Sequence, residues 1–186
     1  LDHSKKIICF SGDDIKTSPD DPSYLKDIAE EITKADLQGK YQILLRRCPV
    51  DLSGRFDDVV KAYGDLIREA PPLWYYNSSK DWTSVYPTKK DVKLLVSTVF
   101  YSDVVVNVGS TMVFDFAMFN KPCVFINYDQ ENKKEKGWFV KKIYEFQHFR
   151  SMPSKASVIW LNNKEEIVKK VTNGEYDDSL VQLWKE

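Results

Sequence analysis

Short runs of apolar, mostly β-branched residues alternate along the chain with longer segments in which apolar residues recur every three or four positions. The first pattern is typical of strands in a buried parallel sheet, and the second is typical of amphipathic helices. The apolar runs predict strands at residues 7–10, 41–45, 73–76, 104–108, 123–128 and 158–161. The three- and four-residue spacing predicts helices at residues 22–37, 56–67, 92–100, 138–146 and 164–172, with a last short helix that contains residues 180–184. Because strands and helices alternate, the expected fold is α/β, a doubly wound, mainly parallel, six-stranded sheet with helices on both faces.

The stretch from residue 103 to residue 129 contains the clearest unit of this kind. A buried strand ends at Gly109, and Ser110 or Thr111 can cap the short helix that follows. Lys121-Pro122 ends that helix, because proline disfavours the helical conformation of the residue before it. The stretch therefore predicts a strand, a tight turn, a helix and a second strand.

Asp115 lies in the middle of this helix, although the helix is apolar nearly all round and is expected to be buried. An ionised carboxylate in such surroundings needs a hydrogen-bond partner or an open cleft. A diphosphate held by the turn at residues 109–111, with a ribose hydroxyl pair held by Asp115, would satisfy every group. The alternative is structural: Ser110 caps the helix, and Asp115 complements the helix dipole or pairs with a buried arginine.

The charge balance restricts the classes of ligand. Lysine plus arginine (27) nearly equal aspartate plus glutamate (28) in the 186-residue chain, so no global field favours nucleic acid and any anion site must be local. No apolar run approaches the roughly 20 residues of a membrane span, and the start of the chain lacks the apolar core of a signal peptide. The expected location is the cytoplasm. The chain begins with Leu1 and not with Met, as expected for a piece of a longer protein.

The three cysteines do not indicate a metal site or a disulfide framework. Cys9, Cys48 and Cys123 lie within or at the end of predicted strands and lack Cys-x-x-Cys spacing, and the only histidines are His3 and His148. The cysteines are interpreted as small buried residues.

In a doubly wound sheet, ligands bind beyond the carboxyl ends of the strands, where the strand order reverses. The loops at that edge offer small-residue turns, an arginine pair and aromatic side chains, a combination suited to a nucleotide diphosphate. Because side chains alternate along a strand, only one of Arg46 and Arg47 is expected to face the cleft. Trp82 could stack on a base or could instead cover an edge of the core. The candidate binding residues are Ser11, Gly12, Arg46, Trp82, Gly109, Ser110, Thr111 and Asp115.

Residues 110–122, followed by residues 125–129, resemble the C-terminal, donor-binding half of GT-B glycosyltransferases. The similarity is greatest to the CDP-glycerol glycerophosphotransferases, whose pattern has Ser-Ser, Phe-Asp-Phe or Phe-Asp-Tyr, Lys-Pro and Tyr-Asp. Asp115 falls where many GT-B enzymes carry the acidic residue that holds the donor ribose. Residues 42–49 resemble the Arg-x-His-Pro motif of these families; Arg46 matches, but Cys48 stands where histidine is usual.

The resemblance implies that residues 1–186 form a single Rossmann-like, nucleotide-donor-binding domain of a longer two-domain enzyme. It implies transfer from a nucleoside-diphosphate sugar, or of a polyol phosphate, to an acceptor hydroxyl, as in bacterial surface polysaccharide synthesis. The chain contains no Asp-x-Asp pair, in agreement with metal-independent chemistry and no cofactor besides the donor. The expected partners are the donor and the N-terminal acceptor-binding domain, with peripheral membrane association of the parent left open. That domain normally supplies the general base, so no catalytic residue is assigned and this chain alone is not expected to turn over.

Other classes of protein fit less well. Asp13-Asp14 after the first strand is similar to the acidic pair of a receiver domain, but the third predicted strand runs into Tyr75-Tyr76-Asn77 and lacks the aspartate that a receiver phosphorylates. Neither the Gly-x-Gly-x-x-Gly pattern of dinucleotide oxidoreductases nor the Gly-Lys-Ser/Thr pattern of phosphate-loop NTPases occurs. A nucleotide-sugar 2-epimerase, which shares the GT-B architecture, and a non-catalytic nucleotide-binding module remain as alternatives.

Overall fold

The computed structural model describes residues 1–77, 85–150, 152–172 and 178–185. Six strands form one sheet in the order β3-β2-β1-β6-β7-β8, and every neighbouring pair is parallel. This confirms the predicted doubly wound, six-stranded sheet. The strands are β1 (Lys6–Ser11), β2 (Tyr41–Arg46), β3 (Ile67–Glu69), β6 (Val104–Asn107), β7 (Cys123–Ile126) and β8 (Ile159–Leu161).

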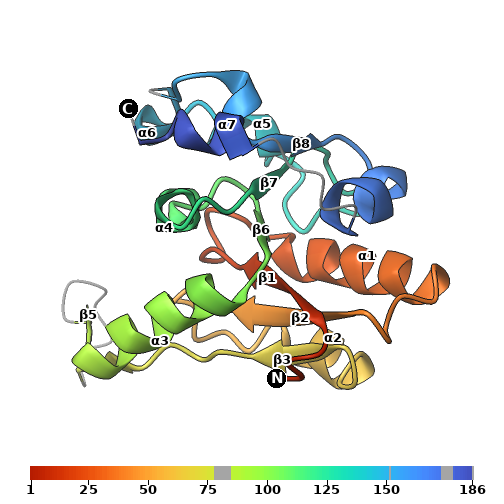
Figure 1. Cartoon of the computed structure of the whole chain (residues 1–186). Coiled ribbons are helices and arrows are strands. Elements are labelled where there is room, and N and C mark those ends of the chain that lie inside the picture. Colours follow the sequence, from red (N-terminus) through yellow and green to blue (C-terminus); the bar gives the residue numbers. More distant parts are fainter. Residues whose placement is uncertain (78–84, 151, 173–177, 186) are drawn as a thin grey trace.

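Helices cover both faces of the sheet, with α1 and α2 on one side and α3 and α4 on the other (Figure 1). The helices are α1 (Asp21–Lys34), α2 (Asp57–Ala62), α3 (Lys89–Tyr101), α4 (Met112–Met118), α5 (Val140–Ile143), α6 (Gln147–Arg150) and α7 (Asp178–Gln182). Beyond β7 the predicted helices are wrong in length. Residues 138–150 form only the two short helices α5 and α6, and residues 164–172 form a 3₁₀ turn, η3 (Lys164–Glu166), and a π-helical turn, η4 (Val168–Thr172). Another 3₁₀ turn, η2 (Lys155–Ser157), precedes β8.

The core lies between the sheet and its helices, and α1 shows why the sequence places it there. Its apolar residues recur at helical spacing, so one stripe faces the sheet and the opposite side carries the charges. Tyr24, Leu25, Ile28 and Ile32 of this stripe are 0% exposed. The hydroxyl of Tyr24 donates a 2.7 Å hydrogen bond to the carbonyl oxygen of Tyr128, which fixes α1 to the segment after β7.

The third strand of the sheet is not the predicted one. Residues 73–76 were expected to form it, but Ile67–Glu69 pairs with β2 instead. Ile67 fits a helical spacing with the apolar residues of α2, yet the helix ends at Ala62 and Ile67 is buried at the sheet. After Pro71-Pro72 the chain leaves the sheet, and β4 (Trp74–Tyr75) pairs with β5 (Tyr86–Pro87) in a separate antiparallel ribbon at the left of Figure 1.

Helix α4 is less buried than its composition predicts. Val113 and Phe116 are buried, but Met118 is 68% exposed and Phe119, just after the helix, is 40% exposed. The helix therefore buries one side against the sheet and leaves the other at the surface.

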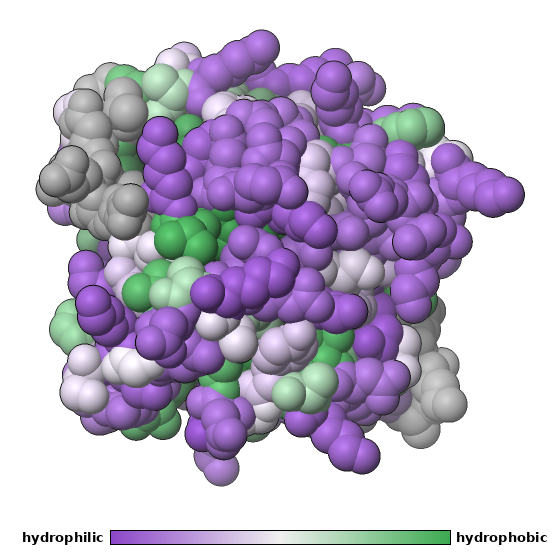
Figure 2. Space-filling view, turned by 90° about the vertical axis from the view of Figure 1, so that its right-hand side faces the viewer, coloured by the Kyte–Doolittle hydropathy of each residue, from purple (hydrophilic) through white to green (hydrophobic). Residues whose placement is uncertain are grey.

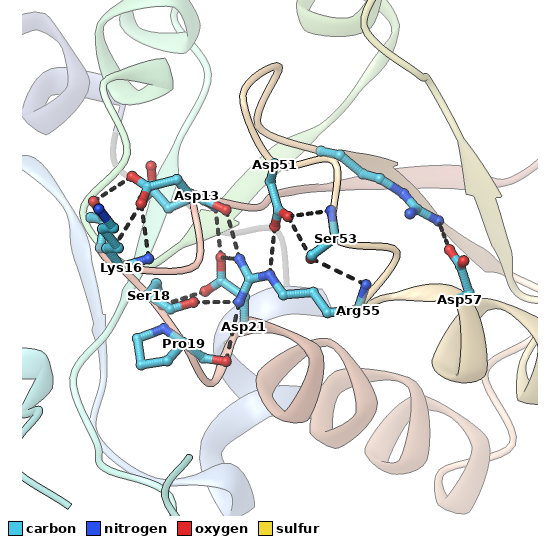
Figure 3. A network of polar contacts seen from close by, with 12 residues as sticks. Asp13, Lys16, Ser18, Pro19, Asp21, Asp51, Ser53, Arg55 and Asp57 are labelled. Carbon is cyan, nitrogen blue, oxygen red and sulfur yellow. Dashed lines mark hydrogen bonds and ion pairs between the residues drawn. The ribbon is translucent and has the colours of Figure 1, made fainter. Parts of the chain in front are cut away.

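A buried guanidinium joins the loop after β1 to the loop after β2 (Figure 3). Arg55 donates from Nε to Asp51 at 2.5 Å, from Nη1 to the carbonyl oxygen of Ser18 at 2.6 Å, and from Nη2 to the carbonyl oxygen of Asp13 at 2.6 Å. Its side chain is only 7% exposed, and its guanidinium lies 4.8 Å from the centre of the Phe56 ring. Because five donors are available in a fixed fork, one arginine can hold two loops together.

The side of the molecule at the right of Figure 1, where α1 lies, is covered mainly by hydrophilic side chains (Figure 2). In the part of the chain that the structure describes, no helix is both long enough and apolar enough to cross a bilayer.

Replacing Arg55 by methionine should lower the free energy of unfolding by about 4 kcal/mol, because buried carboxylates would lose their partner. Urea denaturation measures this loss. Arg47→Met is the matched control: Arg47 contacts Asp57 and Glu69, whose side chains are 66% and 33% exposed, and surface pairs of this kind contribute less than about 1 kcal/mol. Equal losses of stability in the two variants would contradict the conclusion that Arg55 holds the two loops together.

Candidate functional site

A pocket of about 310 Å³ lies beyond the carboxyl ends of the strands. Strand β1 stands between β2 and β6, so the strand order reverses there, and this is where a doubly wound sheet opens a crevice. Of the eight residues predicted as binding residues, six line this pocket: Ser11, Gly12, Arg46, Ser110, Thr111 and Asp115. Gly109 is not among the lining residues, and Trp82 lies outside the described residues.

The turn after β6 is shaped by its local sequence. Gly109 has a φ of +64°, a conformation that L side chains rarely adopt, and a Cβ atom there would come within 2.6 Å of Ile143. Asn107 supports the turn from inside, since its Oδ1 accepts a 2.7 Å hydrogen bond from the backbone N–H of Ser110. The turn places Ser110 Oγ 3.1 Å from Ser11 Oγ, which joins the ends of β6 and β1. Gly109 thus shapes the turn but does not line the pocket.

Ser110, and not Thr111, caps helix α4. The backbone N–H of Met112 donates to Ser110 Oγ at 3.4 Å, whereas Thr111 already has helical dihedral angles and makes no side-chain cap. Thr111 is exposed at the mouth of the pocket, so its hydroxyl is available to a ligand.

Gly12 lies where β1 leaves the sheet. A Cβ atom on Gly12 would stand 2.8 Å from the ring of Phe56, so this position excludes larger residues by close packing. The backbone N–H of Gly12 donates to the carbonyl oxygen of Arg46 at 2.9 Å, which extends the pairing of β1 with β2 into the wall of the pocket.

Arg46 is held at the end of β2 by Asp91 of α3. Its Nη2 lies 2.9 Å from both carboxylate oxygens of Asp91, and the two side chains are 6% and 3% exposed. Arg46 Nη1 is buried and has no hydrogen-bond partner among the described residues. A buried guanidinium N–H without a partner is costly, so this edge of Arg46 is suited to an anionic oxygen.

Arg47 also borders the pocket, but its guanidinium is engaged elsewhere. It donates to Glu69 at 2.6 Å and to Asp57 at 2.7 Å. Both arginines therefore line the pocket, although the alternation along β2 predicted that only one would face it. They differ in their contacts: Arg47 is held by two carboxylates, whereas Arg46 has a buried donor without a partner in the described structure.

The Asp115 carboxyl is partly buried in the pocket wall, and burial raises its pKa above the usual range of an aspartate. Among the residues that the structure describes, it has no hydrogen-bond or ion-pair partner. The alternative that Asp115 pairs with a buried arginine finds no support in this part of the chain, since Arg46 is paired with Asp91.

Asp13 is a second acid of the pocket wall, and sequence reasoning missed it as a site residue. Burial raises its pKa to about 8, with further contributions from the neighbouring carboxylates of Asp21 and Asp14 and an opposing one from Arg55. Its Oδ2 is buried without a partner in the described structure. Asp13 is therefore mainly protonated at neutral pH.

Trp74, Pro87 and Asp91 are further pocket residues that the sequence did not reveal. Trp74 and Pro87 are opposite one another in the β4–β5 ribbon, and Trp74 Nε1 donates to Asp91 at 2.8 Å. The sequence predicts residue 74 in the third strand of the sheet. The strands β4 and β5 are each two residues long, which is too short for a recognisable sequence pattern. Asp91 occupies the first turn of a helix, where an acidic residue is usually exposed.

The described pocket contains no convincing general base. Cys48 lines it where related motifs have histidine, but burial raises the pKa of this thiol to about 11 and keeps it protonated. His148 lies on α6, against the ring of Phe149 at 4.2 Å, and is not part of the pocket lining.

A larger hollow, of about 500 Å³, lies between α1 and the segment after β7. Five carboxylates and two lysines line it, so its charge disfavours a diphosphate. The pocket at the strand ends is smaller, but its unpartnered groups make it the better candidate for an anionic ligand.

No protein-family model matches the sequence, and no curated protein matches it either. Solved structures do share its fold. A variant of the wall teichoic acid polymerase TagF with CDPG matches with a TM-score of 0.56 and 17% identity, over 100% of this chain and 36% of that chain. S. aureus MnaA with UDP matches with a TM-score of 0.57 and 14% identity, over 99% of this chain and 41% of that chain. The UDP-GlcNAc 2-epimerase from Neisseria meningitidis, bound to UDP-GlcNAc, matches with a TM-score of 0.56 and 8% identity, over 99% and 40% of the two chains.

This chain thus spans only 36% to 41% of the length of these proteins. It shares its Rossmann-like α/β fold with a part of each of these proteins.

Proposed function

We propose that this chain binds a nucleoside diphosphate, as the donor-binding half of a glycosyltransferase. The observation that carries the proposal is the pocket between β1 and β6, in which Arg46 Nη1 and the Asp115 carboxyl lack protein partners and Thr111 is exposed. A diphosphate oxygen would accept from Arg46, and a pair of ribose hydroxyls would donate to Asp115. Each unpartnered group would then gain the partner that its chemistry requires.

The proposed reaction is metal-independent transfer to an acceptor hydroxyl in the synthesis of a surface polysaccharide. Positive charge from Arg46 and hydroxyl donors at residues 110 and 111 would stabilise the departing nucleotide phosphates. The general base would come from the rest of a longer protein, because the thiol of Cys48 is protonated and the Asp115 carboxylate of the described pocket is assigned to the ribose hydroxyls.

A nucleotide-sugar 2-epimerase is the second candidate, because an epimerase bound to UDP-GlcNAc has the same fold. A CDP-glycerol-type glycerophosphotransferase is a third possibility, since TagF with CDPG has the same fold. The base of the preferred nucleotide separates these options: CDP supports a polyol-phosphate donor, and UDP supports a sugar donor or an epimerase.

Calorimetric titration of this chain with UDP, CDP, GDP and ADP, each beside its nucleoside, should show one diphosphate binding more tightly than the others and than its own nucleoside. The diphosphate adds charge-assisted hydrogen bonds, each of which contributes about 1.5–3 kcal/mol, or roughly tenfold or more in affinity. No preference for any diphosphate over its nucleoside would contradict the proposal.

Asp115→Asn should lower the affinity for that diphosphate about tenfold or more, because an amide accepts fewer hydroxyl donors than a carboxylate. The free energy of unfolding should not fall, since the variant removes a carboxylate that burial disfavours. Asp129→Asn is the control, because Asp129 lies outside this pocket and its Oδ1 accepts from the backbone N–H of Val140. Loss of stability with unchanged affinity would indicate that Asp115 is structural.

Arg46→Ala should weaken diphosphate binding about 30-fold and leave nucleoside binding nearly unchanged, because it removes a charge-assisted contact of about 2 kcal/mol. The variant also breaks the buried pair with Asp91, at a cost of about 3 kcal/mol in stability. Asp91→Asn is the matched control: it breaks the same pair but keeps the guanidinium. Titrations are compared at a temperature at which circular dichroism shows both variants folded. Equal losses of affinity for the diphosphate and its nucleoside would exclude a phosphate role for Arg46.

A further inference from the structure

Four carboxyls and one guanidinium lie in the loops after β1 and β2 and at the first residue of α1, beside the pocket (Figure 3). The acids are Asp13, Asp14, Asp21 and Asp51, and Arg55 is the cation among them. Only Asp13 of the four acids lines the pocket. Four ionised carboxylates around one cation would carry a net negative charge, which is unfavourable next to a diphosphate.

The four acids differ in the hydrogen bonds that they accept. Asp51 accepts from Ser53 and from Arg55 Nε, and Asp21 accepts from Ser18 Oγ at 2.5 Å and from the backbone N–H of Asp13 at 2.6 Å.

Asp14 has partners as well. It accepts from the backbone N–H groups of Lys16 and Thr17 and from the Thr17 hydroxyl. The Asp13 carboxyl accepts no hydrogen bond from the described residues, and its Oδ2 is buried. Because hydrogen bonds to a carboxylate favour its charged form, Asp13 is the acid that these surroundings leave neutral.

We propose that Asp13 is a specificity-determining residue of the pocket, whose neutral carboxyl admits an anionic ligand and whose ionised form repels it. The proposal rests on the nucleoside diphosphate site described above. It requires no direct contact with the ligand, because a charge in the poorly solvated wall of a pocket acts over several ångströms.

Binding of the diphosphate and protonation of Asp13 favour one another. A bound diphosphate favours the protonated form of Asp13, so binding takes up a proton and affinity falls as the pH rises through the pKa of this carboxyl. That pKa is about 8 in the free protein, raised by burial and by the neighbouring carboxylates.

Other titratable or charged groups face Asp13. They are Asp14 on its own loop, Asp21 of α1, Arg55 and Cys48 from the segment after β2, and Tyr144 at the end of α5. Burial raises the pKa of Asp21 to about 6 and that of Cys48 to about 11, and it raises the pKa of Tyr144 well above its ordinary value. Among Asp13, Asp21, Cys48 and Tyr144, Asp13 is therefore the group that titrates between pH 7.5 and 9.5.

The test is calorimetric titration of this chain with CDP and UDP at pH 7.5 and pH 9.5, where their terminal phosphate, with a pKa of about 6, is already ionised. The affinity of the natural chain should fall about sixfold across this range, if binding raises the pKa of Asp13 by about one unit. Asp13→Asn should bind at both pH values as tightly as the natural chain does at pH 7.5. Asp14→Asn, the matched control, should keep the decline, and cytidine and uridine should show none.

Each outcome decides a different point. Diphosphate binding that does not change with pH, or the same decline in Asp13→Asn, would overturn this inference and leave the proposed function standing. Absence of diphosphate binding at both pH values would overturn the two together. Carbon-13 NMR titration of the aspartate carboxyls in the free chain gives a further check: Asp13 should titrate near pH 8, and titration below pH 6 would refute the inference even if diphosphates bind.

Discussion

The arrangement of the pocket depends on the hydrogen bonds that the carboxylate of Asp91 accepts. It accepts from Arg46 at the end of β2, from the backbone N–H of Leu73 at 2.7 Å and from Trp74 Nε1 at 2.8 Å. One buried side chain therefore ties together the sheet, the β4–β5 ribbon and the first turn of α3. Burying an ion pair costs desolvation energy, but several well-aligned donors around one carboxylate offset much of it. The same contacts hold Arg46 in a single orientation, with one edge unpartnered beside the pocket.

Some buried polar atoms outside the pocket also lack partners in the described structure: Asp20 Oδ2, Gln38 Oε1, Thr98 Oγ1, Ser102 Oγ and Ser157 Oγ. These atoms are scattered over the chain, and none of their residues lines the pocket. Around the pocket, Arg46 Nη1 and Asp13 Oδ2 are buried without partners, and Asp115 has none in the described structure. A folded chain usually pairs such groups, and local exceptions concentrate at functional sites. The unpartnered groups of Arg46, Asp13 and Asp115 line one pocket, and this grouping is a physical argument for a ligand site, independent of any resemblance to other proteins.

Much of the fold could be predicted from the sequence, because strands buried in a parallel sheet leave continuous apolar runs. Strands β1, β2, β6, β7 and β8 follow such runs. The third strand could not be found this way, since β3 is a three-residue edge strand whose first residue, Ile67, also fits the spacing of the preceding helix. The sequence identifies Asp115 as a candidate site residue because it interrupts an apolar helix. It does not identify Asp91 and Asp13, because an acid in a first helical turn or in a polar loop is ordinary, and only the tertiary contacts bury these two carboxyls.

The chemistry of the pocket restricts the ligand more than its shape does. In the proposed site, the unpartnered edge of Arg46 suits an anionic oxygen, whereas the Asp115 carboxylate suits hydroxyl or amino donors and would repel a second anion placed against it. Inorganic phosphate satisfies the first group only, and a nucleoside satisfies the second only. A nucleoside diphosphate carries both, and the separation between its phosphates and its ribose hydroxyls keeps the negative charge away from Asp115. A neutral Asp13 would add no negative charge to the wall of the proposed phosphate site. Asp115 and Asp13 thus have opposite requirements in the proposed complex: Asp115 is an acceptor when ionised, and Asp13 is compatible with the ligand when protonated.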